Sequence, residues 1–271
     1  MKQEFSISSN PDLPKDRAKL SVRIGDRHAG FVITDSQTGE LSVLAMVTGE
    51  DISSTTLDEL LEGSASSGTY QQVTVCYDHP QSLLVPFSLY DEPSGRGMLE
   101  AGYGIMETDV VLSDRIPAWQ VVNTYAVPAA IHQWVKQNFP AADEIHQYTV
   151  SVKNIAAIED QGHLLVDFRS DQFTVLVIRK NDLMLAQTFP YTSPPDVIYY
   201  LLKCTSQFEL PADNTKLVIS GLVDQQSILC HDLQQYFLGI EFRSADWSDA
   251  EVQTYPSHFF TSLNDLARCE S

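Results

Sequence analysis

Residues 163–204, HLLVDFRSDQFTVLVIRKNDLMLAQTFPYTSPPDVIYYLLKC, decide the fold of this chain. Three short runs rich in branched and aromatic residues, HLLVDF, FTVLVI and LMLAQTF, alternate with polar turn residues, which is typical of a strand meander. The segment SPPDVIYYLLKC follows, with proline in its first turn and apolar residues at helical spacing. The stretch therefore predicts a unit of three strands and one helix.

The same unit occurs earlier in the chain. The runs KLSVRI, AGFVIT and LSVLAMV lie between residues 19 and 47, and a helix follows with Thr55 or Thr56 as its N-cap. An offset of 144 residues aligns the two units without a gap. The matched positions are Val22 with Val166, Ile24 with Phe168, Val32 with Leu176, Ile33 with Val177, Leu41 with Leu185 and Leu57 with Leu201. This alignment predicts two similar α/β halves.

Each half contains further elements after its meander. The segments QQVTVCY, SLLVPFSLY, METDVVLS and WQVVNTYAV are strand candidates, and PAAIHQWVKQNF is a helix. In the second half TKLVIS is a strand that leads through Gly221 into the helix DQQSILCHDLQQYF, and HFFTSLNDLARC is a C-terminal helix. GSASSG at 63–68 is expected to be a surface loop, and SGRGMLEAGYG at 94–104 a turn region. We expect an N-terminal extension (1–18), a first lobe (19–155) and a second lobe that includes the C-terminal helix (156–271).

Composition excludes several classes of partner. The 271 residues contain 17 Lys and Arg against 36 Asp and Glu, a net charge of −19 that repels nucleic acid and anionic membrane surfaces. Two of the four cysteines lie inside the apolar runs VTVCYD and YYLLKC, which indicates buried thiols, and the absence of a CxxC pair argues against a structural zinc site. No apolar run is long enough to cross a bilayer, and the polar start MKQEFSISSNPDLPKD does not resemble a signal peptide. These features favour the cytoplasm.

Two tandem units of this kind, with a strand, glycine and helix near the end, resemble the superfamily of actin, sugar kinases and Hsp70. The resemblance implies a two-lobed actin-like ATPase fold, which is ribonuclease H-like. More closely, the chain is similar to a bacterial family of unknown function with that fold. The segments LVPFSLY (84–90), QTFPYTSPPDVIYYLLKC, LVISG and HFFTSLNDLARC carry this resemblance.

The resemblance also implies where a nucleotide would bind. Two Asp-x-Gly hairpins clamp the phosphates and Mg²⁺ in active members, and a Gly-Gly element faces the adenosine. Here each motif is altered: Arg23 replaces the first acid, Arg169 replaces the second glycine, and one glycine remains in the adenosine element. The resulting degenerate cleft comprises Arg23, Gly25, Asp26, Asp167, Arg169, Ser170, Ser220 and Gly221. We therefore expect no bound cofactor and no metal.

Arg23 has three interpretations at this stage. Its guanidinium could bind phosphate in place of the metal, or pair with Asp167 and fill the vacant metal site. The third interpretation is an arginine that points to solvent from an edge strand. The tripeptide Asp78-His79-Pro80 after a strand is expected to be a polar turn, with a site residue as the alternative.

Two functions remain open. The first is a non-catalytic scaffold or module that binds a protein or peptide, in analogy with relatives of this fold that dock segments of pilus or secretion machinery. The second is an atypical phosphotransferase or ATPase in which Arg23 and Arg169 bind phosphate and Asp167 serves as base or metal ligand, with ATP and Mg²⁺ as cofactors. Arg23 at the metal position favours the first function.

Overall fold

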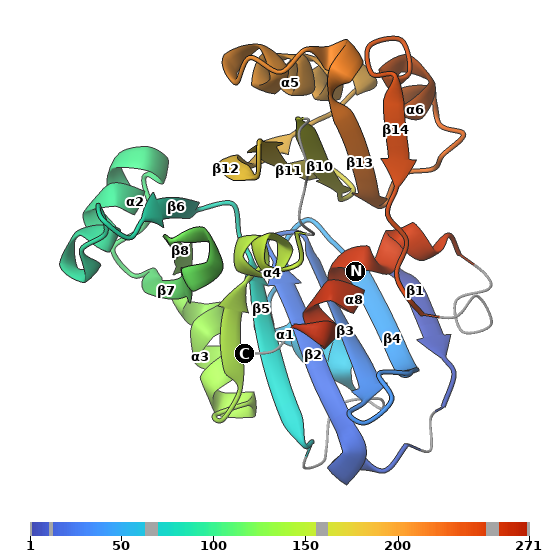
Figure 1. Ribbon diagram of the computed structural model, residues 1–271. Helices are drawn as coiled ribbons and strands as arrows, with labels where there is room; N and C mark the ends of the chain where they lie inside the picture. Colours follow the sequence, from blue (N-terminus) through green and yellow to red (C-terminus); the bar gives the residue numbers. More distant parts are fainter. Residues whose placement is uncertain (1, 11–12, 63–69, 156–161, 248–254, 270–271) are drawn as a thin grey trace. The chain divides into compact units, whose positions relative to one another are not determined.

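The computed structural model describes residues 2–10, 13–62, 70–155, 162–247 and 255–269 (Figure 1). These residues form two compact units. The first unit takes its residues from 1–153, 247–253 and 263–271, and the second from 154–246 and 254–262. The expected loop at 63–68 lies outside the described residues, as do residues 156–161 at the expected start of the second lobe. No helix in the described ranges is both long and apolar enough to span a membrane.

The first unit is built on a six-stranded sheet in the order β1-β4-β3-β2-β5-β9. Its strands are β1 (Lys2–Ser8), β2 (Ala18–Gly25), β3 (His28–Asp35), β4 (Leu41–Thr48), β5 (Gln72–Asp78) and β9 (Asp143–His146). The helices α1 (Ser54–Leu61) and α3 (Ala129–Asn138) pack on one face, and α4 (Gln147–Lys153) and α8 (Thr261–Arg268) lie on the other (Figure 1). The first unit also contains a smaller sheet of three strands in the order β6 (Ser82–Pro86), β8 (Val121–Val127) and β7 (Val110–Ile116). The helix α2 (Gly95–Tyr103) lies between β6 and β7 in the sequence.

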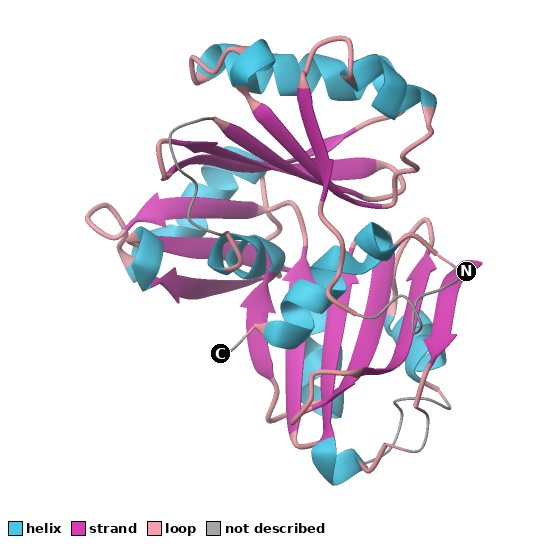
Figure 2. Cartoon of the chain, turned by 45° about the vertical axis from the view of Figure 1, so that its right-hand side comes forward, coloured by secondary structure: helices cyan, strands magenta, loops and turns pink. Residues whose placement is uncertain are grey.

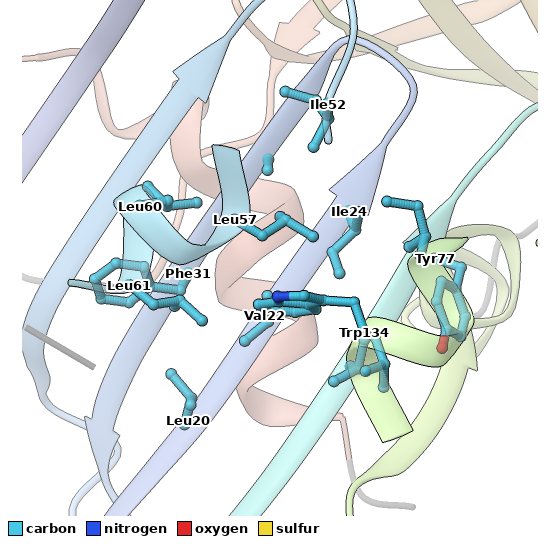
Figure 3. Packing of buried hydrophobic residues seen from close by; sticks show 14 of the residues in the cluster. Leu20, Val22, Ile24, Phe31, Ile52, Leu57, Leu60, Leu61, Tyr77 and Trp134 are labelled. Carbon is cyan, nitrogen blue, oxygen red and sulfur yellow. The ribbon is translucent and has the colours of Figure 1, made fainter. Parts of the chain in front are cut away.

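Branched and aromatic residues that alternate along the strands build the core of the first unit. Figure 3 shows Leu57 and Leu61 of α1 near Val22 of β2, with Trp134 extending from α3 into the same layer. Val22 and Leu57 have no exposed surface. The odd-numbered positions of β2 face the opposite side of the sheet, because side chains alternate along a strand. Arg23 therefore belongs to the α4 and α8 face.

The second unit is a five-stranded sheet in the order β12-β11-β10-β13-β14, covered on one face by two helices (Figure 2). Its elements are β10 (His163–Phe168), β11 (Gln172–Arg179), β12 (Asp182–Pro190), α5 (Pro194–Gln207), β13 (Lys216–Gly221), α6 (Ile228–Leu233) and β14 (Gly239–Phe242). Ser193 and Asp196 form a capping box at the start of α5, and prolines occupy its first turn. Val197 and Leu201 bury the apolar face of this helix.

The predicted duplication is confirmed by topology and register. The order β4-β3-β2-β5-β9 in one sheet matches β12-β11-β10-β13-β14 in the other. Val22 pairs with Val75 and Val166 pairs with Ile219, and both members shift by 144 residues (166 − 22 and 219 − 75). A register shift follows Ile33 in β3 and Val177 in β11, again 144 residues apart (177 − 33).

Several expectations about individual elements are wrong. Within the segment 94–104, expected as a turn, residues 95–103 form α2, and its C-cap Gly104 has the left-handed conformation (φ 64°). Residues 2–8 of the expected extension pair with β4 as an edge strand. The cap of α1 is Ser53, whose side chain accepts a hydrogen bond from the Thr56 amide, rather than Thr55 or Thr56. From Leu263 onward the C-terminal helix belongs to the first unit, not the second.

Candidate functional site

The candidate site of the first unit lies where β2 and β5 end and β3 begins. Arg23 pairs in register with Cys76, and Gly25 pairs with Asp78. Residues 23, 25, 76 and 78 share one face because side chains alternate along each strand. His28, the first residue of β3, lies across the hairpin from Gly25. The topology thus gathers residues that are up to 55 positions apart in the sequence.

A buried ion network occupies this position. Arg23 donates to Oδ2 of Asp78 from Nε at 2.9 Å, and its Nη2 lies 2.6 Å from the same oxygen. The His28 Nε2 atom is 2.7 Å from that oxygen as well. Arg23 and Asp78 are only 4% and 3% exposed. Arg23 is therefore not a solvated arginine on an edge strand, since β2 is interior to the sheet and the guanidinium is neutralised by Asp78.

The His28 ring covers Gly25. A Cβ atom added to Gly25 would lie 2.3 Å from Cε1 of His28, far inside van der Waals contact. The glycine that would let phosphate approach the backbone in an active relative therefore accommodates an imidazole of the same chain. Burial also raises the pKa of the neighbouring Cys76 thiol well above its ordinary value, so this sulfur is not a thiolate nucleophile.

Asp78 and His79 are not the polar turn expected from the sequence. His79 is 2% exposed, and its Nδ1 lies 2.5 Å from Oδ1 of Asp26. Its carbonyl oxygen accepts a hydrogen bond from Nε2 of His146 at 2.9 Å. The Tyr148 amide donates to Nδ1 of His146 at 3.0 Å, which fixes the neutral Nε2-H tautomer of that ring. The segment after β5 is thus an organised part of the site.

In the second unit a row of polar side chains crosses the sheet. The register places Thr188, Thr174, Asp167 and Ser220 opposite one another on β12, β11, β10 and β13. Asp167 accepts hydrogen bonds from the hydroxyl of Ser220 at 2.9 Å and from that of Ser262 at 3.0 Å. The two hydroxyls hold the carboxylate in a defined orientation.

Arg169 lies in the turn between β10 and β11, and its side chain bonds to a residue of β11. Its side chain is 3% exposed, and Nη1 donates to the Thr174 hydroxyl at 2.8 Å. Its amide bonds to the carbonyl oxygen of Gln172, and its own carbonyl oxygen accepts from the Tyr191 hydroxyl. The adjacent Ser170 is exposed. The position expected to hold glycine thus contains a buried guanidinium.

Gly221 is required by the sheet itself. It has a φ of 85°, and a Cβ there would lie 2.1 Å from the carbonyl oxygen of Phe168. The amide of Leu222 donates to that same oxygen at 2.8 Å. This glycine therefore serves a close approach of two backbones.

The structure brings the sequence-derived site residues together in two sets, one in each unit. Arg23, Gly25 and Asp26 gather around the start of β3, and Asp167, Ser220 and Gly221 gather at the ends of β10 and β13. The pair of Arg23 with Asp167 would join the two units and stays a prediction. The sequence analysis did not name His28 or Ser262 as site residues. It assigned Asp78 and His79 to a polar turn, with a site residue as the alternative.

The sequence comparison identifies the family, and the structure comparisons identify the fold. The profile of a family described as "Protein of unknown function (DUF3822)" matches residues 10–240. The chain belongs to the DUF3822 family. No curated protein matches it in sequence.

This DUF3822 chain is similar in structure to a Bacteroides thetaiotaomicron protein with an actin-like ATPase fold and unknown function. The TM-score is 0.81 at 17% identity, over 94% of this chain and 97% of that one. A chain in the PilM-PilN type IV pilus biogenesis complex matches with a TM-score of 0.57 at 13% identity, over 94% of this chain and 99% of that one. The fold is therefore that of the actin-like ATPases.

Proposed function

We propose that this chain is a non-catalytic actin-like protein that binds another protein or a peptide. The observation that supports it is the ion network of Arg23, Asp78 and His28, at the position where the resemblance to actin-like ATPases implies the metal and phosphates. A guanidinium repels Mg²⁺, and an imidazole over Gly25 obstructs the backbone amides that would receive phosphate. The residues present do not fit Mg²⁺ and ATP.

The second unit supports the same proposal. Close approach of a phosphate to the β10–β11 hairpin requires a small residue, whereas Arg169 is buried there and bonded to Thr174. An atypical phosphotransferase would use Arg23 and Arg169 to bind phosphate and Asp167 as base or metal ligand. Both guanidinium groups already have partners in their own units, which favours the non-catalytic alternative.

The fold comparison adds an analogy for a binding role. A chain of the PilM-PilN type IV pilus biogenesis complex has this fold, which supports a protein or peptide partner for the present chain. We place the protein in the cytoplasm, because Cys76, Cys204, Cys230 and Cys269 are all buried free thiols. Its acidity argues against nucleic acid as a partner.

Two measurements test the proposal. Calorimetry with ATP, with and without Mg²⁺, measures nucleotide binding, and a phosphate-release assay measures turnover. We expect neither Mg²⁺-dependent binding nor turnover above background. The control is Asp167→Asn, which removes the candidate base while keeping the acceptor oxygen for Ser220. Turnover in the wild-type chain that Asp167→Asn abolishes would establish the phosphotransferase alternative and refute the proposal.

A further inference from the structure

A groove of about 400 Å³ lies between α1 and α3 in the first unit. Leu61, Trp134 and Phe139 form its apolar lining, and the rings of Trp134 and Phe139 meet edge to face at 5.8 Å. Figure 3 shows Leu61 and Trp134 at this side of the sheet, extending from the two helices. The groove is distinct from the Arg23 network, because α1 and α3 pack on the opposite face of the sheet.

The polar wall of the groove is acidic. Asp58, Glu59 and Glu62 line it, and all three are exposed. Among the described residues that line the groove there is no lysine, arginine or histidine. The Trp134 Nε1 group donates to Oδ1 of Asp58 at 2.8 Å, which fixes that carboxylate beside the indole. Three carboxylates around an aromatic lining are complementary to a cationic side chain with an apolar stem.

The position of these acids in the helix points to a cation as well. Asp58, Glu59 and Glu62 lie at the carboxyl end of α1, where the helix dipole is negative, and the last turn contains no basic residue. Negative charge at this end is unfavourable, whereas acids in the first turn would be favourable. α1 has no acid in its first turn. The arrangement costs stability in the chain alone, and a bound cation would relieve the repulsion.

We propose that the groove between α1 and α3 binds a segment of a partner protein that presents lysine or arginine side chains. The inference rests on the proposed protein-binding function and names the chemistry of the partner. An arginine stem packs on the partly exposed ring of Phe139 while its guanidinium meets Glu59 and Glu62. The net charge of −19 attracts such a segment from a distance and accelerates the encounter.

The test uses the full chain and a synthetic capped peptide of alternating leucine and arginine, with a matched peptide in which citrulline replaces arginine. The groove variant is Glu59→Gln with Glu62→Gln. The control variant is Glu40→Gln with Glu107→Gln, which removes the same charge from exposed positions outside the groove. Calorimetry at low salt measures the Kd, and thermal unfolding of each variant measures its stability.

We expect saturable binding of the arginine peptide, at least tenfold weaker with citrulline and about tenfold weaker in the groove variant. The control variant should change the Kd less than twofold. The groove variant should also have an equal or higher Tm, since it removes charges that oppose the dipole, whereas a purely structural role would lower it. Absence of binding, or equal losses in the two variants, would overturn the inference. ATP turnover in the same chain would refute the proposed function and leave the groove result intact.

Discussion

Replacing Asp78 with asparagine removes the charge that neutralises Arg23 and keeps the volume of the side chain. Arg23 is 4% exposed, and both its Nε and Nη2 atoms contact Oδ2 of Asp78. Removing one partner of a buried pair costs about 3 to 5 kcal/mol, because the remaining charge stays desolvated without compensation. Asparagine retains one acceptor oxygen, so we expect the lower end of that range, about 3 kcal/mol. This is a large share of a total stability of about 5 to 15 kcal/mol.

Urea unfolding followed by tryptophan fluorescence measures this cost. Trp119, Trp134 and Trp247 are the three tryptophans of the chain, and all belong to the first unit, so the signal reports that unit. The Arg23→Met variant and the double variant complete a thermodynamic cycle. We expect the double variant to be more stable than Asp78→Asn alone. The prediction is refuted if Asp78→Asn lowers the free energy of unfolding by less than about 1 kcal/mol and the cycle shows no coupling between Arg23 and Asp78. The two residues would then behave like a solvated surface pair.

Three further predictions concern packing and pH. Gly25→Ala should cost about 1 to 3 kcal/mol, because the new methyl displaces the His28 ring, and adding His28→Ala should recover part of the loss in the same urea assay. Gly221→Ala should cost about 3 kcal/mol or more, because Gly221 has a φ of 85° and the new methyl would collide with the carbonyl oxygen of Phe168. Gly39→Ala is the control for backbone strain alone, since Gly39 has a φ of 74° and open space around it. Burial lowers the pKa of His258 below its ordinary value of about 6.5, so its contribution to stability is present above that pH and is lost as the pH falls through the folded pKa. Hydrogen exchange of the second unit between pH 7.5 and 5 should show this loss, and His258→Gln should flatten it.

The duplicated unit could be predicted from sequence because each of its signals is local. The run HLLVDF coincides with β10 residue for residue, and FTVLVI and LMLAQTF fall within β11 and β12. Branched residues with short polar turns specify such a meander without help from distant parts of the chain. The offset of 144 residues that aligns the two sequences also relates the strand pairings of the two sheets, because the same alternation of buried positions sets the register in each half.

Helix α2 could not be predicted because its own sequence opposes it. Gly95, Gly97 and Gly102 reduce helix propensity, and the segment lacks a side-chain cap. The helix nevertheless buries Leu99, which has no exposed surface, and ends at a left-handed glycine. Tertiary packing therefore outweighs a local preference that is worth about 1 kcal/mol per glycine.

The site was only partly predictable, for a different reason. The motif comparison selected Arg23 as a candidate, but its partner Asp78 follows it by 55 positions and adjoins β2 only through the parallel pairing of β2 with β5. A carboxylate that directly follows the buried run VTVCY was the available signal, since the carboxyl end of an interior strand is a common place for site residues. The proline two positions later favoured a turn instead.

Retained glycines do not by themselves argue for a retained nucleotide site. Gly25 admits the His28 ring, and Gly221 admits the Phe168 carbonyl oxygen at a positive φ. Each glycine is therefore required by a neighbour in its own unit, whether or not any phosphate binds. The altered positions are the informative ones, because Arg23 and Arg169 are buried charges with specific partners and not solvated substitutions. A buried charge costs free energy unless it is paired, so each arginine had to be accommodated together with its partner. Under the proposed non-catalytic function, a strong coupling between Arg23 and Asp78 is the expected result, because the two buried groups then stabilise the fold as one pair.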